Sequence, residues 1–243
     1  MLASAACRLA EMNLPGQPQL TVALIGGVAT RSEARGRGYA SRLLTLCLEW
    51  AQNRGAAVAF LWSGRGELYE RLGFASSGTQ LRVPLDSFLL AQRLEGVEWR
   101  SGLTPAIERE LIEKRSGGLL LRKRDLIWVR AHRNIDWQGL YRGRELLAYA
   151  AIGKGIDLPH CVHEWGGRAE ILPGFFAELS VRDPRLQLLL SPAQLDRLGF
   201  AGVPACAEPL VYARSLSTIE VRNPEGLVRN LPKDFWFWGL DGC

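Results

Sequence analysis

The chain has 243 residues, of which 47% are hydrophobic and 23% charged, a composition typical of a soluble globular protein with one large domain or two small ones. Its net charge of +5 suits a polyanionic ligand but does not by itself indicate nucleic-acid binding. The five cysteines are scattered without a C-x-x-C pair, and no apolar run reaches the roughly 18 residues of a membrane span, so we expect a cytoplasmic protein with no disulfide framework, no metal and no membrane partner.

The first predicted elements are a buried strand and a helix joined by an arginine-rich turn. Residues 20–30 are apolar and rich in β-branched side chains, which predicts the strand. Residues 31–37 form the polar turn, and a helix is predicted over 38–53. The apolar face of that helix is expected to contain Leu43, Leu46, Cys47, Trp50 and Ala51.

Three further elements complete an α/β unit. A buried strand is predicted at 56–62, a short helix at 67–72 and another strand at 81–85. Strands that alternate with helices in this way predict a partly parallel sheet.

A second α/β stretch follows a polar junction at residues 93–102. Thr104 and Pro105 predict the start of a helix that reaches about Arg115. The remaining patterns predict strands at 127–132, 161–165 and 186–190, a hairpin at 140–152 and a helix at 175–182.

A short sequence recurs within the chain. Glu67-Leu-Tyr-Glu-Arg-Leu-Gly-Phe74 returns 126 residues later as Ala193-Gln-Leu-Asp-Arg-Leu-Gly-Phe200, and each copy follows a short apolar strand. This shared context favours a duplicated domain. The second copy has Leu195 in place of Tyr69 and lacks a glycine-rich turn, so we expect the first copy to carry the chemistry.

The turn before the first long helix is a candidate anion site. Arg35-Gly-Arg-Gly-Tyr-Ala40 fits the pattern R-x-x-G-x-A. Its glycines let a ligand approach the backbone, and the next helix offers unpaired N–H groups, so the turn can hold a diphosphate, although a solvated arginine-rich turn has the same appearance. The segment lacks the Gly-Lys-Ser/Thr of a Walker loop and the third glycine of a dinucleotide fingerprint.

Two segments resemble motifs of the GNAT acetyltransferase superfamily. Residues 28–44 are similar to its motif A, and Tyr69–Phe74 resembles its motif B at the expected distance. The two-domain plan resembles the enhanced-intracellular-survival (Eis) type. The resemblance implies an α/β (α+β) fold of tandem GNAT-like domains with mixed, partly parallel sheets: a catalytic domain at 1–92, a degenerate domain at 93–214 and an extension at 215–243 that packs back on the core.

The resemblance also implies a site for acetyl-coenzyme A. The family's pantetheine-pairing strand corresponds to Val28, Ala29 and Thr30, and its diphosphate-binding amides correspond to Gly36, Arg37, Gly38, Tyr39, Ala40 and Ser41, with charge added by Arg35 and Arg37. Tyr69 matches the tyrosine that donates a proton to the coenzyme A thiolate. A phenol, with a pKa of about 10, is suited to protonate a thiolate whose conjugate acid has a pKa of about 8.5. The alternative is that Tyr69 only packs in the core.

The general base has three candidates. Glu164 lies on a predicted buried strand, where it is either a base or a carboxylate satisfied by His163 or a backbone group. In Eis-type enzymes the terminal carboxylate reaches the active site. The carboxylate of Cys243, or Asp241 in the same aromatic tail, is therefore the other candidate.

A GNAT domain usually has a strand, two helices and a further strand before the segment that begins here. We therefore expect the first domain to be N-terminally incomplete, and either a missing segment, another segment or another subunit to cover the sheet edge near the acceptor site. A homo-oligomer is left open.

Two functions are carried forward. One is an N-acetyltransferase in which a primary amine attacks directly; the acceptor is a small amine, an aminoglycoside-like compound or a protein amino group. The other is a non-catalytic acyl-coenzyme A-binding or interaction module. Nucleic-acid binding by Arg31, Arg35, Arg37 and Arg42 is not expected, because the cluster lacks interleaved aromatics and a recognisable motif.

Overall fold

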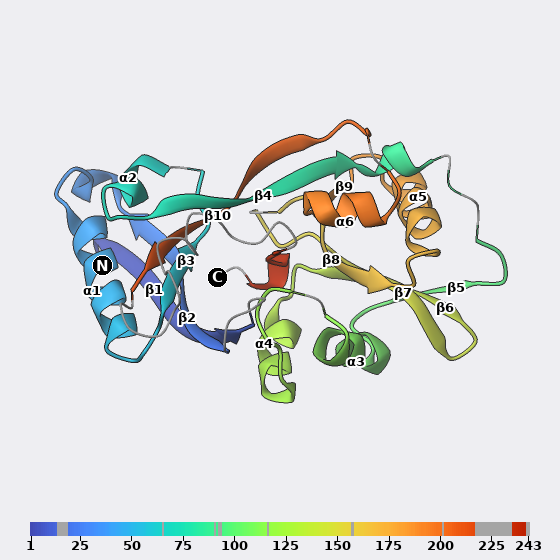
Figure 1. The fold of residues 1–243 in the computed structure, drawn as a ribbon, viewed down its shortest axis with the longest axis horizontal. Helices are drawn as coiled ribbons and strands as arrows, with labels where there is room; N and C mark the ends of the chain where they lie inside the picture. Colours follow the sequence, from blue (N-terminus) through green and yellow to red (C-terminus); the bar gives the residue numbers. More distant parts are fainter. Residues whose placement is uncertain are drawn as a thin grey trace.

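One continuous sheet of ten strands runs through the part of the chain that the computed structural model describes, in the order β1-β2-β3-β10-β4-β9-β8-β7-β6-β5 (Figure 1). The described residues are 1–13, 19–64, 66–89, 91, 94–115, 117–156, 158–200, 202–216 and 235–241. The sheet contains parallel and antiparallel pairs, and helices pack on it, which confirms the predicted mixed α/β fold.

The N-terminal half contains β1 (Ala3–Met12), β2 (Leu20–Thr30), η1 (Ser32–Ala34), α1 (Tyr39–Gln52), β3 (Val58–Leu61), α2 (Gly66–Glu70) and β4 (Ala75–Pro84). β1 is antiparallel to β2, and β2 is parallel to β3. β4 starts directly after Phe74, earlier than predicted. Its first residues are mostly polar and so lack the apolar pattern by which a strand is predicted.

The helix α1 is confirmed, but the predicted buried face is only partly right, since Ala51 is buried and Cys47 is partly buried whereas Leu46 and Trp50 are exposed. The residues that α1 buries are Leu44, Leu48 and Ala51, which follow one another at helical spacing. Leu46 and Trp50 are 55% and 38% exposed. The helix carries apolar residues on more than one side, so their distribution alone did not identify the side that faces the sheet.

The second half contains η2 (Leu85–Phe88), β5 (Glu98–Ser101), α3 (Pro105–Glu113), η3 (Lys123–Asp125), α4 (Leu126–Ala131), β6 (Asp136–Arg142), β7 (Glu145–Ile152), β8 (Cys161–Gly167), α5 (Leu172–Arg182), β9 (Gln187–Leu190), α6 (Pro192–Arg197), β10 (Cys206–Ser215) and η4 (Gly239–Asp241). The predicted hairpin is formed by β6 and β7, and the predicted start of α3 is confirmed by the Thr104 side chain, which caps it.

The strand predicted at residues 127–132 is wrong, because this segment is the helix α4. Leu126 and Val129 are buried at helical spacing, whereas Ile127 and Trp128 are 67% and 70% exposed. The Asp125 side chain accepts a hydrogen bond from the N–H of Arg122 at 2.7 Å and so closes the turn before the helix. This local turn outweighs the β propensity of the apolar run.

The two copies of the recurring sequence occupy equivalent places and exchange strands. The units β3-α2-β4 and β9-α6-β10 have the same order, and Gly73 and Gly199 have similar φ angles of 79° and 75°. The last strand of each unit pairs with the first strand of the other, since β4 is antiparallel to β9 and β10 is antiparallel to β3. β4 and β10 also pair with each other. The predicted domain limits stay a prediction, but the two halves share one sheet.

The aromatic tail, residues 235–241, is buried, as its composition predicts. The Phe237 ring lies 4.9 Å from the ring of Phe60 and 5.1 Å from that of Trp62, which connects the tail to β3. No helix in the described ranges is long and apolar enough to cross a membrane.

Candidate active site

β2 and β3 separate before β2 ends. Their parallel pairing runs from Val22 and Val58 to Ile25 and Leu61, where β3 stops, while β2 continues to Thr30. The end of β2 remains paired with β1 on its other side, through Ala29 and Thr30. One edge of residues 28–30 therefore faces a gap with no strand partner in the described chain. An extended ligand can pair with such an edge through backbone hydrogen bonds.

The turn between β2 and α1 is open to an anion. Gly36 and Gly38 have φ angles of 76° and 75°, and a Cβ added at either would meet nothing within 4 Å. Gly38 is the N-cap of α1 and supplies no side-chain cap. No partner is present for the N–H groups of Tyr39, Ala40 and Ser41 among the described residues. Open space beside free helix N–H groups fits a diphosphate.

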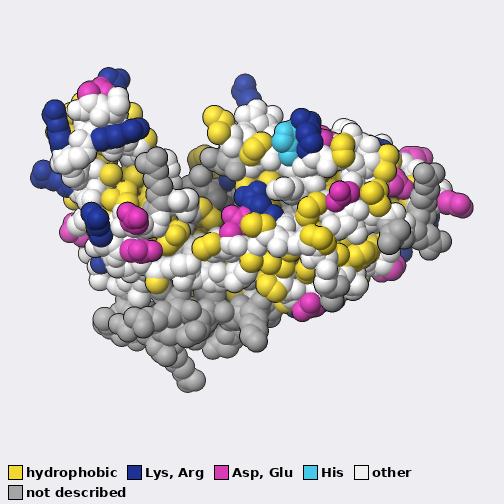
Figure 2. Space-filling view, turned by 90° about the horizontal axis from the view of Figure 1, so that it is seen from above, with side chains coloured by type: hydrophobic (Ala, Val, Ile, Leu, Met, Phe, Trp, Pro, Cys, Tyr) yellow, Lys and Arg dark blue, Asp and Glu magenta, His cyan; other side chains and the backbone are white. Residues whose placement is uncertain are grey.

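Arginines add positive charge around this turn. Arg35, Arg37 and Arg42 are exposed, and Arg31 pairs with Glu33 at 3.6 Å. Figure 2 shows Lys and Arg side chains over the smaller lobe, which a deep notch separates from the larger part of the molecule. The charge on this lobe favours an anionic ligand.

Tyr69 lies on α2, the short helix that follows β3. It belongs to the same buried cluster as Ile25 and Leu61, the last paired residues of the two strands. Its ring is 6.2 Å from that of Phe74 and 6.4 Å from that of Tyr212, and 8% of the residue is exposed. Its hydroxyl has no hydrogen-bond partner in the described part of the chain. The phenolic proton is therefore not donated to another side chain or to the backbone there.

The family model described as the acetyltransferase (GNAT) domain matches residues 2–76. Over these residues the chain is similar to that domain. The matched range includes the open edge of β2, the glycine turn and Tyr69.

Solved structures show the same fold. A GCN5-related N-acetyltransferase from Anabaena variabilis has a TM-score of 0.62 and 14% identity, over 88% of this chain and 59% of its own. A probable N-acyltransferase from Enterococcus faecalis has a TM-score of 0.62 and 18% identity, over 89% and 59%. Eis1 from Mycobacterium abscessus has a TM-score of 0.58 and 15% identity, over 89% and 62%.

The chain thus spans about three fifths of the length of these structures. The likeness in fold extends beyond residues 2–76 into the second half of the sheet. No curated protein matches the sequence.

A separate buried cluster holds the predicted base Glu164. Nε and Nη2 of Arg115 donate to the two carboxylate oxygens of Glu164, each at 2.9 Å. Nη2 of Arg115 also lies 2.7 Å from Oδ1 of Asp241. Burial raises the pKa of Glu164 to about 7, although its pairing with Arg115 acts in the opposite direction. Arg115, rather than His163 or a backbone group, therefore satisfies this carboxylate.

The predicted site residues thus lie in two places. The residues from Val28 to Ser41 and Tyr69 lie in the N-terminal half, on β2, the turn after it, α1 and α2, whereas Glu164 lies on β8 with Arg115 and Asp241. Cys243 lies outside the described residues. The assignment of the base stays a prediction. Sequence reasoning missed Arg115; the signal available was that two carboxylates on apolar segments require a buried cation.

A cavity of about 660 Å³ lies between β1 and α4. Its lining includes Arg8, Arg54, Trp128 and Leu240. It borders Thr21, near the start of β2, at the opposite end of that strand from the glycine turn. We therefore do not assign it to the cofactor. Within the described residues, no group of three or more His, Cys, Asp or Glu side chains is arranged to hold a metal ion.

Proposed function

We propose that the protein is an N-acetyltransferase that transfers the acetyl group of acetyl-coenzyme A to a primary amine. The observation that carries this proposal is the gap beside β2. An unpaired backbone edge borders it, and free N–H groups at the start of α1 follow that edge in the chain. Tyr69 belongs to the same buried cluster as Ile25 and Leu61, the last paired residues of β2 and β3.

In this proposal the backbone binds most of the cofactor. Val28, Ala29 and Thr30 pair with the amides of pantetheine through their free edge. The N–H groups from Gly36 to Ser41 donate to the diphosphate, and Arg35 and Arg37 add charge. The absence of a Cβ at Gly36 and Gly38 leaves room for this close approach.

The chain's own chemical contribution is positioning and proton transfer. Bound acetyl-coenzyme A supplies an activated thioester. The site holds an amine against the acetyl carbon, so that a C–N bond forms as the C–S bond breaks. Tyr69 donates its phenolic proton to the departing sulfur, and a base accepts the proton of the amine.

Three groups remain as candidates for the base. Asp241 is fully buried and pairs with Arg115. Glu164 is fully buried and both of its oxygens are held by Arg115, so it would have to be uncovered before it could accept a proton from an amine. The terminal carboxylate of Cys243 is therefore the first candidate to test, by removing the last residue and by amidating the terminus.

Release of the thiol from acetyl-coenzyme A, measured with spermidine, kanamycin and a lysine peptide as acceptors, tests the proposal. We expect turnover with one of these classes, and Tyr69→Phe should lower kcat by about 10²-fold or more while thermal stabilisation by the cofactor is retained. Tyr212→Phe, which removes a hydroxyl from the neighbouring ring, is the matched control. Binding without turnover would support the non-catalytic acyl-coenzyme A-binding module instead.

A further inference from the structure

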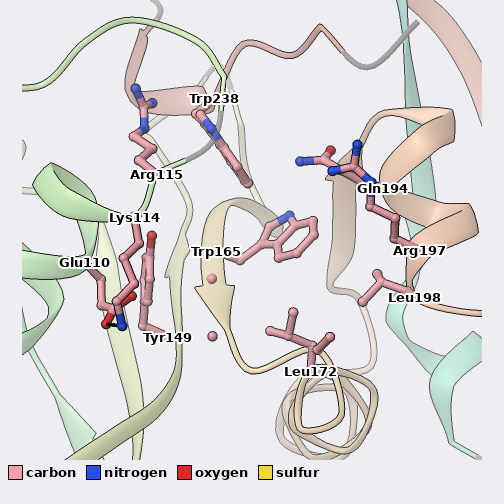
Figure 3. Close-up of a pocket in the computed structure, with 13 residues that line it drawn as sticks. Glu110, Lys114, Arg115, Tyr149, Trp165, Leu172, Gln194, Arg197, Leu198 and Trp238 are labelled. Carbon is pink, nitrogen blue, oxygen red and sulfur yellow. Dashed lines mark hydrogen bonds and ion pairs between the residues drawn. The ribbon is translucent and has the colours of Figure 1, made fainter.

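The second half of the sheet contains a pocket at the place equivalent to the gap beside β2. β8 pairs in parallel with β9 only at Cys161 and Val162, although β8 continues to Gly167. The helix α5 follows β8, and α6 follows β9, as α1 and α2 follow β2 and β3. A pocket of about 360 Å³ opens where these strands diverge (Figure 3).

Aromatic side chains fill the part of this gap that an extended cofactor would need. Trp165 is buried, and its Nε1 donates to the carbonyl of Leu189 at 3.0 Å, which links β8 to the diverging β9. The Trp238 ring packs edge-on against Trp165 at 5.4 Å. The remaining volume is at the lower end of the range for small-molecule pockets. The pocket therefore suits a compact ligand.

Two side chains of the pocket, Gln194 and Arg197, carry hydrogen-bond donors that have no acceptor among the described residues. Gln194 is 91% buried, and its Oε1 accepts the N–H of Ser191 at 2.7 Å. Its amide NH₂ has no acceptor among the described residues. Arg197, on the same helix, has no ion pair in the described part of the chain. Figure 3 shows both side chains reaching from α6 toward the indole of Trp165.

The carboxylate in the lining does not neutralise these donors. Glu110 pairs with Lys114 at 2.8 Å on the other side of the pocket. A guanidinium and an amide NH₂ together match the two oxygens of a carboxylate, and the walls formed by Tyr149, Trp165 and Trp238 match a flat apolar body.

We propose that this pocket binds a small aromatic carboxylate, with its ring against Trp165 and Trp238 and its anionic group on Arg197 and Gln194. The pocket binds and does not acetylate, because Leu195 takes the place of the Tyr69 phenol in this copy. The proposal is independent of the acetyltransferase activity and can be tested without turnover.

The repeat supplies a matched control. Arg71 precedes Leu-Gly-Phe in the first copy as Arg197 does in the second, and both residues are exposed. Arg71→Gln therefore removes the same charge from the same local sequence, outside the pocket.

Calorimetric titration of the full chain with benzoate, phenylacetate and cinnamate, each beside its neutral amide, tests the proposal. We expect saturable binding of at least one acid, at least tenfold tighter than its amide, and a loss of at least tenfold in Arg197→Gln but not in Arg71→Gln. Equal binding of acid and amide, equal loss in both variants, or no saturable binding of any acid would overturn it.

Discussion

Arg82 on β4 and Glu208 on β10 form an ion pair between two strands of the sheet, and 126 residues separate them, the interval of the internal repeat. They are therefore counterparts. Leu81 and Ala207, separated by the same interval, lie opposite each other in the antiparallel ladder. The two halves are thus joined across a local two-fold axis, with the ion pair beside it.

Reversing one charge of this pair should lower the free energy of unfolding, and reversing the second charge as well should restore it. Arg82→Glu places two carboxylates together and should lower the free energy of unfolding by about 1 kcal/mol. Adding Glu208→Arg restores an ion pair and should recover most of the loss. Urea unfolding of the two single variants and the double variant measures the coupling. A double variant that shows only the sum of the single losses would contradict a direct interaction.

Arg115 should be far more important for stability than its neighbour in sequence. Arg115→Leu leaves Glu164 and Asp241 buried without their cation and should cost roughly 3–5 kcal/mol. The Lys114 side chain is 69% exposed and pairs with Glu110, so Lys114→Leu should cost about 0.5 kcal/mol or less. Urea unfolding of the two variants checks the contrast, and similar losses would show that the buried cluster does not stabilise the fold.

The stability of the protein should depend on pH through two buried groups with opposite effects. Burial raises the pKa of Glu164 from 4.5 to about 7. The contribution of this raised pKa to the free energy of unfolding is complete below pH 4.5 and is lost as pH rises through 7. Burial lowers the pKa of His163 from 6.5 to about 4. The contribution of this lowered pKa to the free energy of unfolding is complete above pH 6.5 and is lost as pH falls through 4.

Between about pH 4.5 and 6.5 the two effects oppose each other. Glu164→Gln keeps an acceptor for Arg115 but does not titrate. In that variant the free energy of unfolding should rise with pH by up to about 1.4 kcal/mol per unit across this window, more steeply than in the wild type. Urea unfolding at half-unit steps of pH measures both slopes, and parallel curves for the two proteins would disprove the assignment.

The two ends of α1 provide a test of the cofactor turn. Gly38 and Gly55 have φ angles of 75° and 78°, and a Cβ added at either meets nothing within 4 Å. Alanine at each position should therefore cause a similar backbone strain of about 1–2 kcal/mol. Only Gly38→Ala should weaken coenzyme A binding in calorimetry, by about tenfold or more, because the diphosphate is proposed to approach the backbone there. An equal effect of Gly55→Ala would place the site elsewhere.

The elements around the proposed cofactor site could be predicted because their signals are local. The strand, the turn with Gly36 and Gly38, and the helix follow one another within a short segment, and Tyr69 comes after the next strand. Each of these features depends on backbone conformation and apolar spacing, which neighbouring residues determine.

The remaining features depend on contacts between distant segments. The position of β10 between β3 and β4 leaves no local mark in the sequence, and neither does the contact of Arg115 with Asp241. The buried side of α1 was misjudged because only the sheet decides that Leu48 is covered while Leu46 is not. Patterns of spacing identify an apolar surface but not its partner.

Because β4 and β10 are exchanged between the halves, we do not expect either half to fold when it is expressed alone. A fragment ending at residue 92 would lack β10, the strand that connects β3 to β4, and would leave the hydrogen-bonding edges of both exposed to solvent or to other molecules. A strand of the second half thus completes the sheet of the first, so we expect the two halves to fold as one unit.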